Sequence, residues 1–334
     1  MSRTQRLLFY NLVCRYGDRH ALLDLAVELL LPALFGSHVR RYGPTQYFFA
    51  DVGHVSTHIR GFAGEQLIIF GRFIKDTVLV RDQVYEPQVG LISDNQSMQS
   101  SPSTLFAIDL NNHKLVLAPE VPYAPGADAF ATTLERFLNR EREGYIRAIK
   151  KQEESLAEPR TLAYLYTEFP PAEITVTPLA GSQSVDDFVG QFAKITSLNI
   201  KLLDTNAEFA KRDLFREMRA AKDEVRAKTT TLLHESPAGL SQTAVAEEIK
   251  ASASGGNQKI LVRGTDTDGV KLTGDNNNIK LQVEVTDFPD TVPAAAEQMM
   301  KVFGDQISKN RLTLDDGTVN QDKIDTAREA LRNQ

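Results

Sequence analysis

The feature that most constrains the fold is a stretch of alternating apolar and polar residues between positions 42 and 85. A period of two is typical of strands, because successive side chains of a strand point to opposite faces of a sheet. Short polar or glycine-containing breaks divide this stretch into four strand-like runs, at 47–51, 54–62, 66–74 and 77–85. Breaks of this length are typical of hairpins, so the pattern predicts an antiparallel meander.

The sequence before the meander and directly after it adds a strand, a helix and a loop. Residues 6–15 are bulky and apolar, which predicts a buried strand. Asp18 is a suitable N-cap for a helix whose apolar face is broken at Pro32. Residues 87–102 are mostly polar, and in the run 93–101 the only apolar residue is Met98. This composition predicts an exposed loop.

A hairpin and a long helix complete the N-terminal half. Two apolar runs, 104–110 and 114–118, flank Asn111-Asn112, a pair suited to a hairpin turn. Residues 127–154 then show the spacing of an amphipathic helix. Its inward residues are Phe130, Leu134, Phe137 and Ile149, and its outward residues are Arg136, Arg140, Arg142, Arg147, Lys150 and Lys151.

The second half of the chain predicts a further mixture of strands and helices. The expected strands are 161–167, 173–178, 196–203, 259–263, 270–273 and 279–286. The expected helices are 185–193, a long charged helix at 206–233, 237–253, and 292–303, which should end at Gly304. Strands in runs, without regular strand–helix alternation, indicate an α+β fold. A chain of 334 residues suggests two domains, which we place at 1–158 and 159–304, followed by a polar helical tail at 305–334.

Composition narrows the class of protein. The single cysteine, Cys14, excludes an intramolecular disulfide and a cysteine-based metal cage, and it suggests a reducing compartment. No apolar run approaches the roughly 20 residues of a membrane span, and the N-terminus lacks the pattern of a secretory signal. We therefore expect a cytoplasmic protein without a membrane segment.

Motifs for catalysis are weak throughout. His54 and His58 have the i, i+4 spacing of a metal pair, but the run around them alternates like a strand, which would not bring the two rings together. Asp266-Thr-Asp268-Gly269 resembles the start of a calcium loop, yet Asn277 stands where the loop needs its glutamate. There is no Gly-x-Ser-x-Gly elbow and no complete phosphate-binding glycine loop. We expect no catalytic residue, no metal site and no cofactor, although carboxylates could still converge in the fold.

Charge is unevenly distributed around a net charge of −6. Residues 1–83 hold ten Lys and Arg against seven Asp and Glu, whereas residues 234–334 hold eleven against sixteen. An acidic protein can still carry a basic face, because phosphate binding responds to the local potential.

Two of the predicted helices carry basic residues near helical spacing. The first set is Arg136, Arg140, Arg147, Lys150 and Lys151, and the second is Lys211, Arg212, Arg216, Arg219, Lys222 and Arg226. Rows of guanidinium and ammonium groups can follow the phosphates of a duplex without reading bases. The alternative is ion pairing within each helix, with carboxylates such as Glu141, Glu143 and Glu217, or simply a solvated face.

The order of these parts resembles a known group of proteins. The hairpin at 105–117, a helix, the strand 198–202 leading into a charged helix, and the turn 264–269 before a polar strand pair are the parts concerned. Together they resemble the RexA-type phage-exclusion proteins and related uncharacterised families of bacterial defence loci, whose fold is similar to that of the recombination-associated RdgC proteins. The resemblance implies a non-enzymatic, dimeric protein that binds duplex DNA with little sequence preference. The acidic last third and the tail depart from that pattern.

The sequence therefore supports one leading hypothesis and two alternatives. The leading hypothesis is a phage-defence protein that binds double-stranded DNA through its basic helices as a homodimer. One alternative is a protein-interaction or sensor subunit of a defence system, in which the acidic third and the tail dock a protein partner. The other is a metal-dependent nuclease whose carboxylates meet only in the folded chain.

Overall fold

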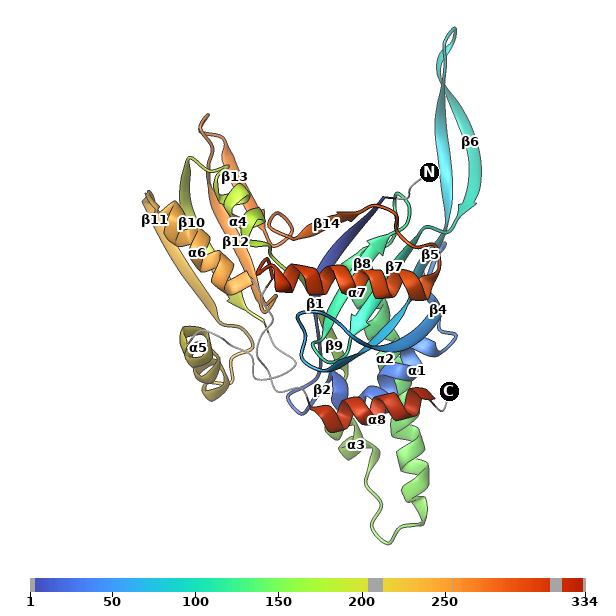
Figure 1. The fold of residues 1–334 in the computed structure, drawn as a ribbon. Helices are drawn as coiled ribbons and strands as arrows, with labels where there is room; N and C mark the ends of the chain where they lie inside the picture. Colours follow the sequence, from blue (N-terminus) through green and yellow to red (C-terminus); the bar gives the residue numbers. More distant parts are fainter. Residues whose placement is uncertain (1–3, 204–212, 254, 313–319, 333–334) are drawn as a thin grey trace.

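The computed structural model describes residues 4–203, 213–253, 255–312 and 320–332, which form two antiparallel sheets with helices packed on them (Figure 1). The fold is α+β, as predicted. None of the helices in these ranges is long and apolar enough to cross a lipid bilayer.

The larger sheet contains ten of the described strands, in the order β14-β1-β8-β7-β5-β4-β3, with β2 and β9 also on β1 and β6 on β5. These strands are β1 (Gln5–Tyr16), β2 (His20–Ala21), β3 (Arg40–Tyr42), β4 (Thr45–His58), β5 (Glu65–Glu86), β6 (Gly90–Ser100), β7 (Ser103–Asp109), β8 (Lys114–Pro119), β9 (Ala172–Pro178) and β14 (Gln282–Val285). The predicted strand at 6–15 and the hairpin at 104–118 are confirmed.

Each face of the larger sheet is covered by its own helices. Alternate side chains of β1 divide between the faces: Leu12 packs under α2 (Ala127–Gln152), and Phe9 stacks on Phe303 of α7 (Val292–Ser308) at 5.5 Å between ring centroids. The α2 face also holds a continuous helical segment made of η1 (Leu22–Leu25), η2 (Ala26–Leu30) and α1 (Leu31–Phe35), together with α8 (Gln321–Arg332). β1 is thus a central strand buried on both sides.

The smaller sheet has the strand order β11-β10-β12-β13. Its strands are β10 (Lys194–Leu202), β11 (Thr231–Leu240), β12 (Gln258–Thr265) and β13 (Lys271–Asp275). The helices α4 (Ser182–Val189), α5 (Asp213–Glu224) and α6 (Gln242–Ala253) contribute to its core through residues such as Phe188, Phe215 and Ile249.

The sheets do not follow the division predicted at residue 158. Both β9 and β14, from the predicted second domain, pair with β1 of the first. The helix α7 likewise packs on the larger sheet. The helix α8 packs on η1 and η2, which cover the other face of that sheet, and its residues Ile324, Ala327 and Leu331 are buried there. Sequence periodicity gives the face of an element but not its partner, so this pairing was not predictable locally. The three-part division remains a prediction about independent folding units.

Three expectations for the N-terminal half were wrong. The helix does not break at Pro32, because proline is tolerated in the first turn of α1, where its missing N–H is not needed. The four runs of the meander form only two long strands, β4 and β5; in β4 a bulge next to Asp51, at φ 51°, absorbs the first break. The expected loop at 87–102 instead contains strand β6, paired with the outer half of β5.

The second half also differs from the expected elements. Residues 161–167 lie mostly in helix α3 (Leu162–Glu168), which Thr161 caps by accepting a hydrogen bond from the Tyr164 backbone N–H. Of the long helix expected at 206–233, the described part is α5, which ends at Glu224, and strand β11 begins at Thr231. The helix expected at 237–253 begins only at Gln242, as α6, because β11 extends to Leu240. The helix α7 does not end at Gly304 but continues to Ser308. Gly304 lies where the helix approaches the Arg60 backbone so closely that a Cβ would not fit.

Candidate nucleic-acid interface

Helix α2 is fixed to the larger sheet by an aromatic cluster on its buried face. The ring of Phe130 meets the rings of Phe49, Phe73 and Phe106 at centroid distances of 5.4, 5.5 and 5.4 Å. Leu134, Leu138 and Ile146, also on this face, are fully buried. Because the core defines the inward face so completely, the opposite face of α2 must point outward.

Four basic residues form a row on that outward face, which we name the α2 stripe: Arg136, Arg140, Arg147 and Lys151. All four are exposed. At 3.6 residues per turn they fall within an arc of about 60° and extend over about 22 Å of helix. None of them makes a hydrogen bond or an ion pair with any residue in the described part of the chain.

The three glutamates of α2 are engaged by residues outside the stripe. Glu135 accepts a hydrogen bond from the Ile174 N–H at 2.9 Å, and Glu141 lies 2.8 Å from the His38 ring nitrogen. Glu143 accepts from Arg142 at 3.0 Å and from the Tyr166 hydroxyl at 2.7 Å. Neither Glu141 nor Glu143 is ion-paired with a stripe residue, so the ion pairing considered from the sequence is not formed there.

Arg142 was expected to point outward and does not. It is buried, its Nε donates to the Phe169 carbonyl, and its guanidinium lies over the Tyr166 ring at 5.2 Å. Position 142 lies about 120° around the helix from Arg136, on the side that faces α3. Its charge therefore joins α2 to α3 rather than facing solvent.

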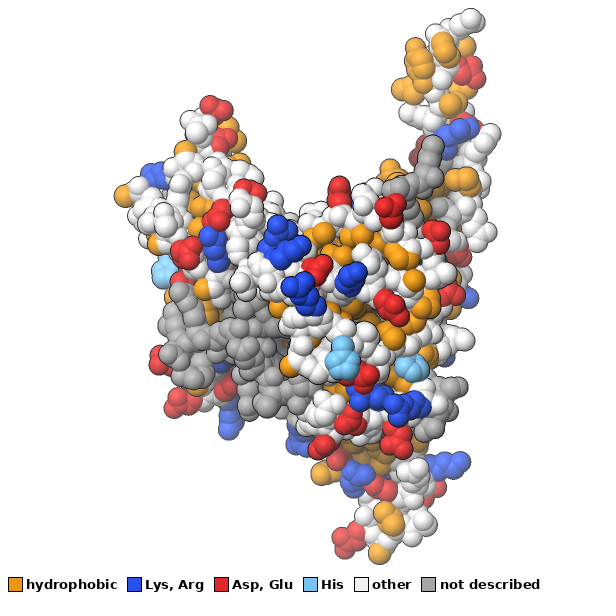
Figure 2. Space-filling view, viewed as in Figure 1, with side chains coloured by type: hydrophobic (Ala, Val, Ile, Leu, Met, Phe, Trp, Pro, Cys, Tyr) orange, Lys and Arg blue, Asp and Glu red, His pale blue; other side chains and the backbone are white. Residues whose placement is uncertain are grey.

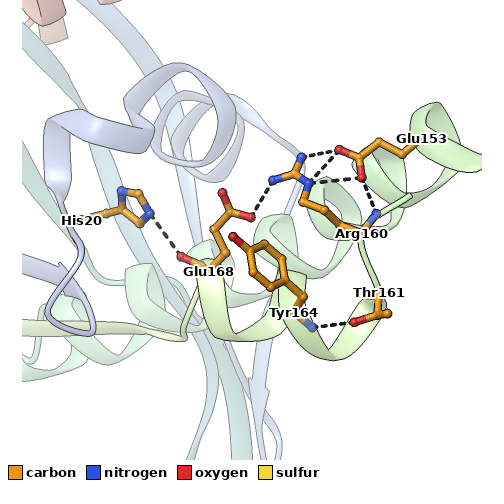
Figure 3. A network of polar contacts seen from close by, with 6 residues as sticks. All are labelled: His20, Glu153, Arg160, Thr161, Tyr164 and Glu168. Atoms are coloured by element: carbon orange, nitrogen blue, oxygen red, sulfur yellow. Dashed lines mark hydrogen bonds and ion pairs between the residues drawn. The ribbon is translucent and has the colours of Figure 1, made fainter. Parts of the chain in front are cut away.

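Lys150, predicted to be part of the basic face, is also used inside the protein. Its Nζ donates to the Arg160 carbonyl at 2.9 Å. Arg160 in turn bridges Glu153, just after α2, and Glu168, at the end of α3 (Figure 3). Arg160 holds the pKa of Glu153 below its usual value. This network fixes the C-terminal end of α2 and leaves Lys151 as the last residue of the stripe.

One further basic residue lies at the other end of the stripe, and the sequence analysis missed it. Arg40 of β3 donates to the Thr133 hydroxyl at 3.2 Å and lies over the Tyr47 ring at 5.1 Å. Thr133 is on the same side of α2 as the stripe, one turn before Arg136. Only the adjacent pair Arg40-Arg41 in the sequence could have signalled this.

The second predicted basic helix does not form a matching stripe. In α5, Arg219 donates to the Leu203 carbonyl at 2.6 Å, and Lys222 is buried. Both share the i, i+3, i+4, i+7 face of the core residues Phe215 and Met218, and so they point toward the smaller sheet. Arg226 is exposed beyond the helix end, at φ 53°.

Lys211 and Arg212, and the side chain of Arg216, lie outside the described residues. Figure 1 shows α5 beside the smaller sheet and α2 against the larger one, well separated in this view. Of the two predicted basic helices, only α2 presents a row of exposed cations within the described part of the chain, so we take the α2 stripe as the candidate interface.

A buried polar network lies where the two sheets meet. Lys114 donates to Asn11 at 2.7 Å, and Asn11 donates to Asn257 at 3.0 Å. In the turn between β7 and β8, just before Lys114, burial raises the pKa of Asp109 to about 6 and lowers that of His113 to about 3. Asp109 accepts hydrogen bonds from Asn112 and from the Asn111 N–H, so its role here is to hold the β7–β8 turn.

A cavity of about 600 Å³ opens nearby, between the N-terminus of α2 and the smaller sheet. Lys259, Asp128 and Asp275 all line it, so it has no consistent charge for binding phosphate. Across the described ranges, no group of three or more His, Cys, Asp and Glu residues is placed to hold a metal ion.

Comparison with known proteins adds no further assignment. No protein-family model matches the chain, and no curated protein has detectable sequence similarity to it. The candidate interface therefore rests on the geometry of α2.

Proposed function

We propose that the protein binds the phosphate backbone of double-stranded DNA through the α2 stripe, with little sequence preference and without catalysis. The observation that carries this proposal is the row of four exposed cations that have no partner among the described residues. Guanidinium groups pair well with phosphate oxygens, and contacts to phosphate carry no base information. The stripe's length of about 22 Å equals the axial length of six or seven base pairs, at about 3.4 Å per base pair.

The rest of the proposal concerns assembly and cellular role. Two copies related by a two-fold axis would present two stripes to one duplex, so we include a homodimer. The resemblance to phage-exclusion proteins supports a role in phage defence. Protection of a bacterial host against phage plating should then require the same cations as DNA binding.

The proposal is tested by the anisotropy of a labelled random-sequence duplex. The test variant replaces all four stripe residues by glutamine: Arg136→Gln, Arg140→Gln, Arg147→Gln and Lys151→Gln. The matched control removes four exposed lysines elsewhere: Lys228→Gln, Lys271→Gln, Lys301→Gln and Lys309→Gln.

We expect the stripe variant to lose binding at least 100-fold at low salt, while the control, with the same net charge, stays within about threefold of wild type. Equal losses in the two variants would show that only net charge matters and would reject the α2 interface. Absence of binding by the wild-type protein at micromolar concentration would reject the proposed function.

A further inference from the structure

A two-stranded arm, formed by residues 77–100, projects from the larger sheet (Figure 1). Its strands are the outer half of β5 and all of β6, paired from Thr77↔Ser100 to Glu86↔Gly90. The neighbours of β5 end before it: β4 pairs only as far as Asp76, and β7 only as far as Ile74. Among the described residues, both outer edges of the arm are therefore unpaired.

The arm exposes an unusual amount of apolar surface. Seven large hydrophobic residues on it are between 43% and 69% exposed: Val78, Leu79, Val80, Tyr85, Val89, Leu91 and Met98. Hydrophobic side chains gather at the projecting end in Figure 2. A two-stranded hairpin alone is only marginally stable in water, and contiguous exposed apolar surface marks an interaction site. The arm is thus built to be covered.

The chemistry of β6 fits a second copy of itself. In an antiparallel pair across a two-fold axis, residues near the axis face their own symmetry mates, so charged residues would repel. The only charged residue of β6 is Asp94, which is ion-paired to Arg81 within the arm. The other exposed residues of β6 are chiefly Ser, Asn and Gln, whose side chains both donate and accept hydrogen bonds.

The part of this edge between its register shift, opposite Arg81–Gln83, and the base of the arm lacks side chains that would block pairing. Free strand edges are usually blocked by lysine, proline or an inward charge. Residues 95–100, Asn-Gln-Ser-Met-Gln-Ser, contain none of these. Two such free edges can pair through backbone hydrogen bonds, as neighbouring strands of a sheet do.

We propose that two copies of this chain associate through their arms, with β6 of one copy pairing antiparallel to β6 of the other. The product is a four-stranded sheet around a two-fold axis, with the two β6 strands at its centre and the two β5 segments outside them. This inference gives an interface to the homodimer of the proposed function and rests on that part of it alone. DNA binding by α2 is not required.

The test measures molecular mass by light scattering, with the full chain and no nucleic acid. Asn95→Lys with Ser97→Lys places like charges across the axis, and Asn95→Asp with Ser97→Asp does the same with the opposite sign. The control, Gln191→Lys with Thr267→Lys, adds the same charge at exposed positions off the arm. Circular dichroism confirms that each variant is folded.

We expect wild type and control to have twice the mass of one chain, and each arm variant alone to have the mass of one chain. An equimolar mixture of the Lys and Asp arm variants should regain the dimer mass, because opposite charges then face each other. A wild-type monomer, or arm variants that remain dimeric, would overturn the proposal. Since the assay contains no DNA, either result leaves the anisotropy test of α2 independent.

Discussion

The salt dependence of DNA binding should report how many cations of the α2 stripe contact phosphate. If all four contribute, each stripe on the duplex should add about −3.6 to the slope of the logarithm of the binding constant against the logarithm of salt concentration, so a dimer with two stripes on one duplex should give about −7.2. Each stripe then accounts for a drop in affinity of about 150-fold between 50 and 200 mM salt. Removing one cation per stripe by Arg140→Gln should change the contribution of each stripe to about −2.7, which corresponds to a drop of about 40-fold per stripe over the same range.

The structure provides an internal control for this measurement on the same helix. Lys150 lies next to the stripe but donates to the Arg160 carbonyl, so its charge is directed away from the stripe. We expect Lys150→Gln to leave the slope unchanged, even if the intercept moves slightly. Anisotropy titrations at five or more salt concentrations, with one random-sequence duplex, give each slope.

Two outcomes would refute the reasoning. If Lys150→Gln lowers the slope as much as Arg140→Gln does, then hydrogen-bond partners do not decide which cations reach phosphate. If neither Arg140→Gln nor Arg147→Gln changes the slope, the stripe does not contact DNA, whatever the affinity of the wild-type protein.

Three further predictions concern the fold and use chemical or thermal unfolding. Gly304→Ala should destabilise the protein by about 1–2 kcal/mol, because a Cβ there would overlap the Arg60 carbonyl, and this overlap outweighs the gain of about 1 kcal/mol in helix propensity. Gly144→Ala should stabilise the protein by up to about 1 kcal/mol, because the space around Gly144 is open. Changes of the same sign in the two variants would contradict this account. Ile324→Ala should cost about 2–5 kcal/mol because this side chain is fully buried, whereas a loss below about 0.5 kcal/mol would show that α8 is not part of the core. Burial lowers the pKa of His113 from 6.5 to about 3, so protonation is disfavoured in the folded state and stability is lost as pH falls through this range; His113→Asn, which tolerates the left-handed backbone at φ 53°, should flatten the stability profile there, and an unchanged profile would count against the assignment.

Local patterns in the sequence predicted those elements whose burial matches their own periodicity. The strand β1, the hairpin β7–β8 and the helix α2 were each placed to within a few residues, because alternation or helical spacing shows which face is buried. The same spacing located the four residues of the α2 stripe. It also contained the information that Arg142 falls on a different side of α2, although this was overlooked.

Elements determined by distant partners were not predictable in this way. Polar β6 is a strand because the outer half of β5 pairs with it, and its own residues show no strand pattern. Pairing of β9 and β14 with β1 joins segments more than 150 residues apart. The helical spacing of α5 already places Arg219 and Lys222 on its apolar face. What they meet there, such as the Leu203 carbonyl that accepts from Arg219, depends on how α5 packs on the smaller sheet.

The separation of core and stripe on α2 has a consequence for how binding can change. Arg140 and Arg142 are two residues apart, yet one is exposed and the other is buried with its Nε on the Phe169 carbonyl. Surface substitutions without such contacts usually change stability by less than about 0.5 kcal/mol, whereas breaking a buried charged hydrogen bond costs several times more. Substitution of Arg140 should therefore alter DNA affinity alone, and substitution of Arg142 should alter stability first. If α2 binds DNA as we propose, its affinity can thus be varied residue by residue without loss of the fold.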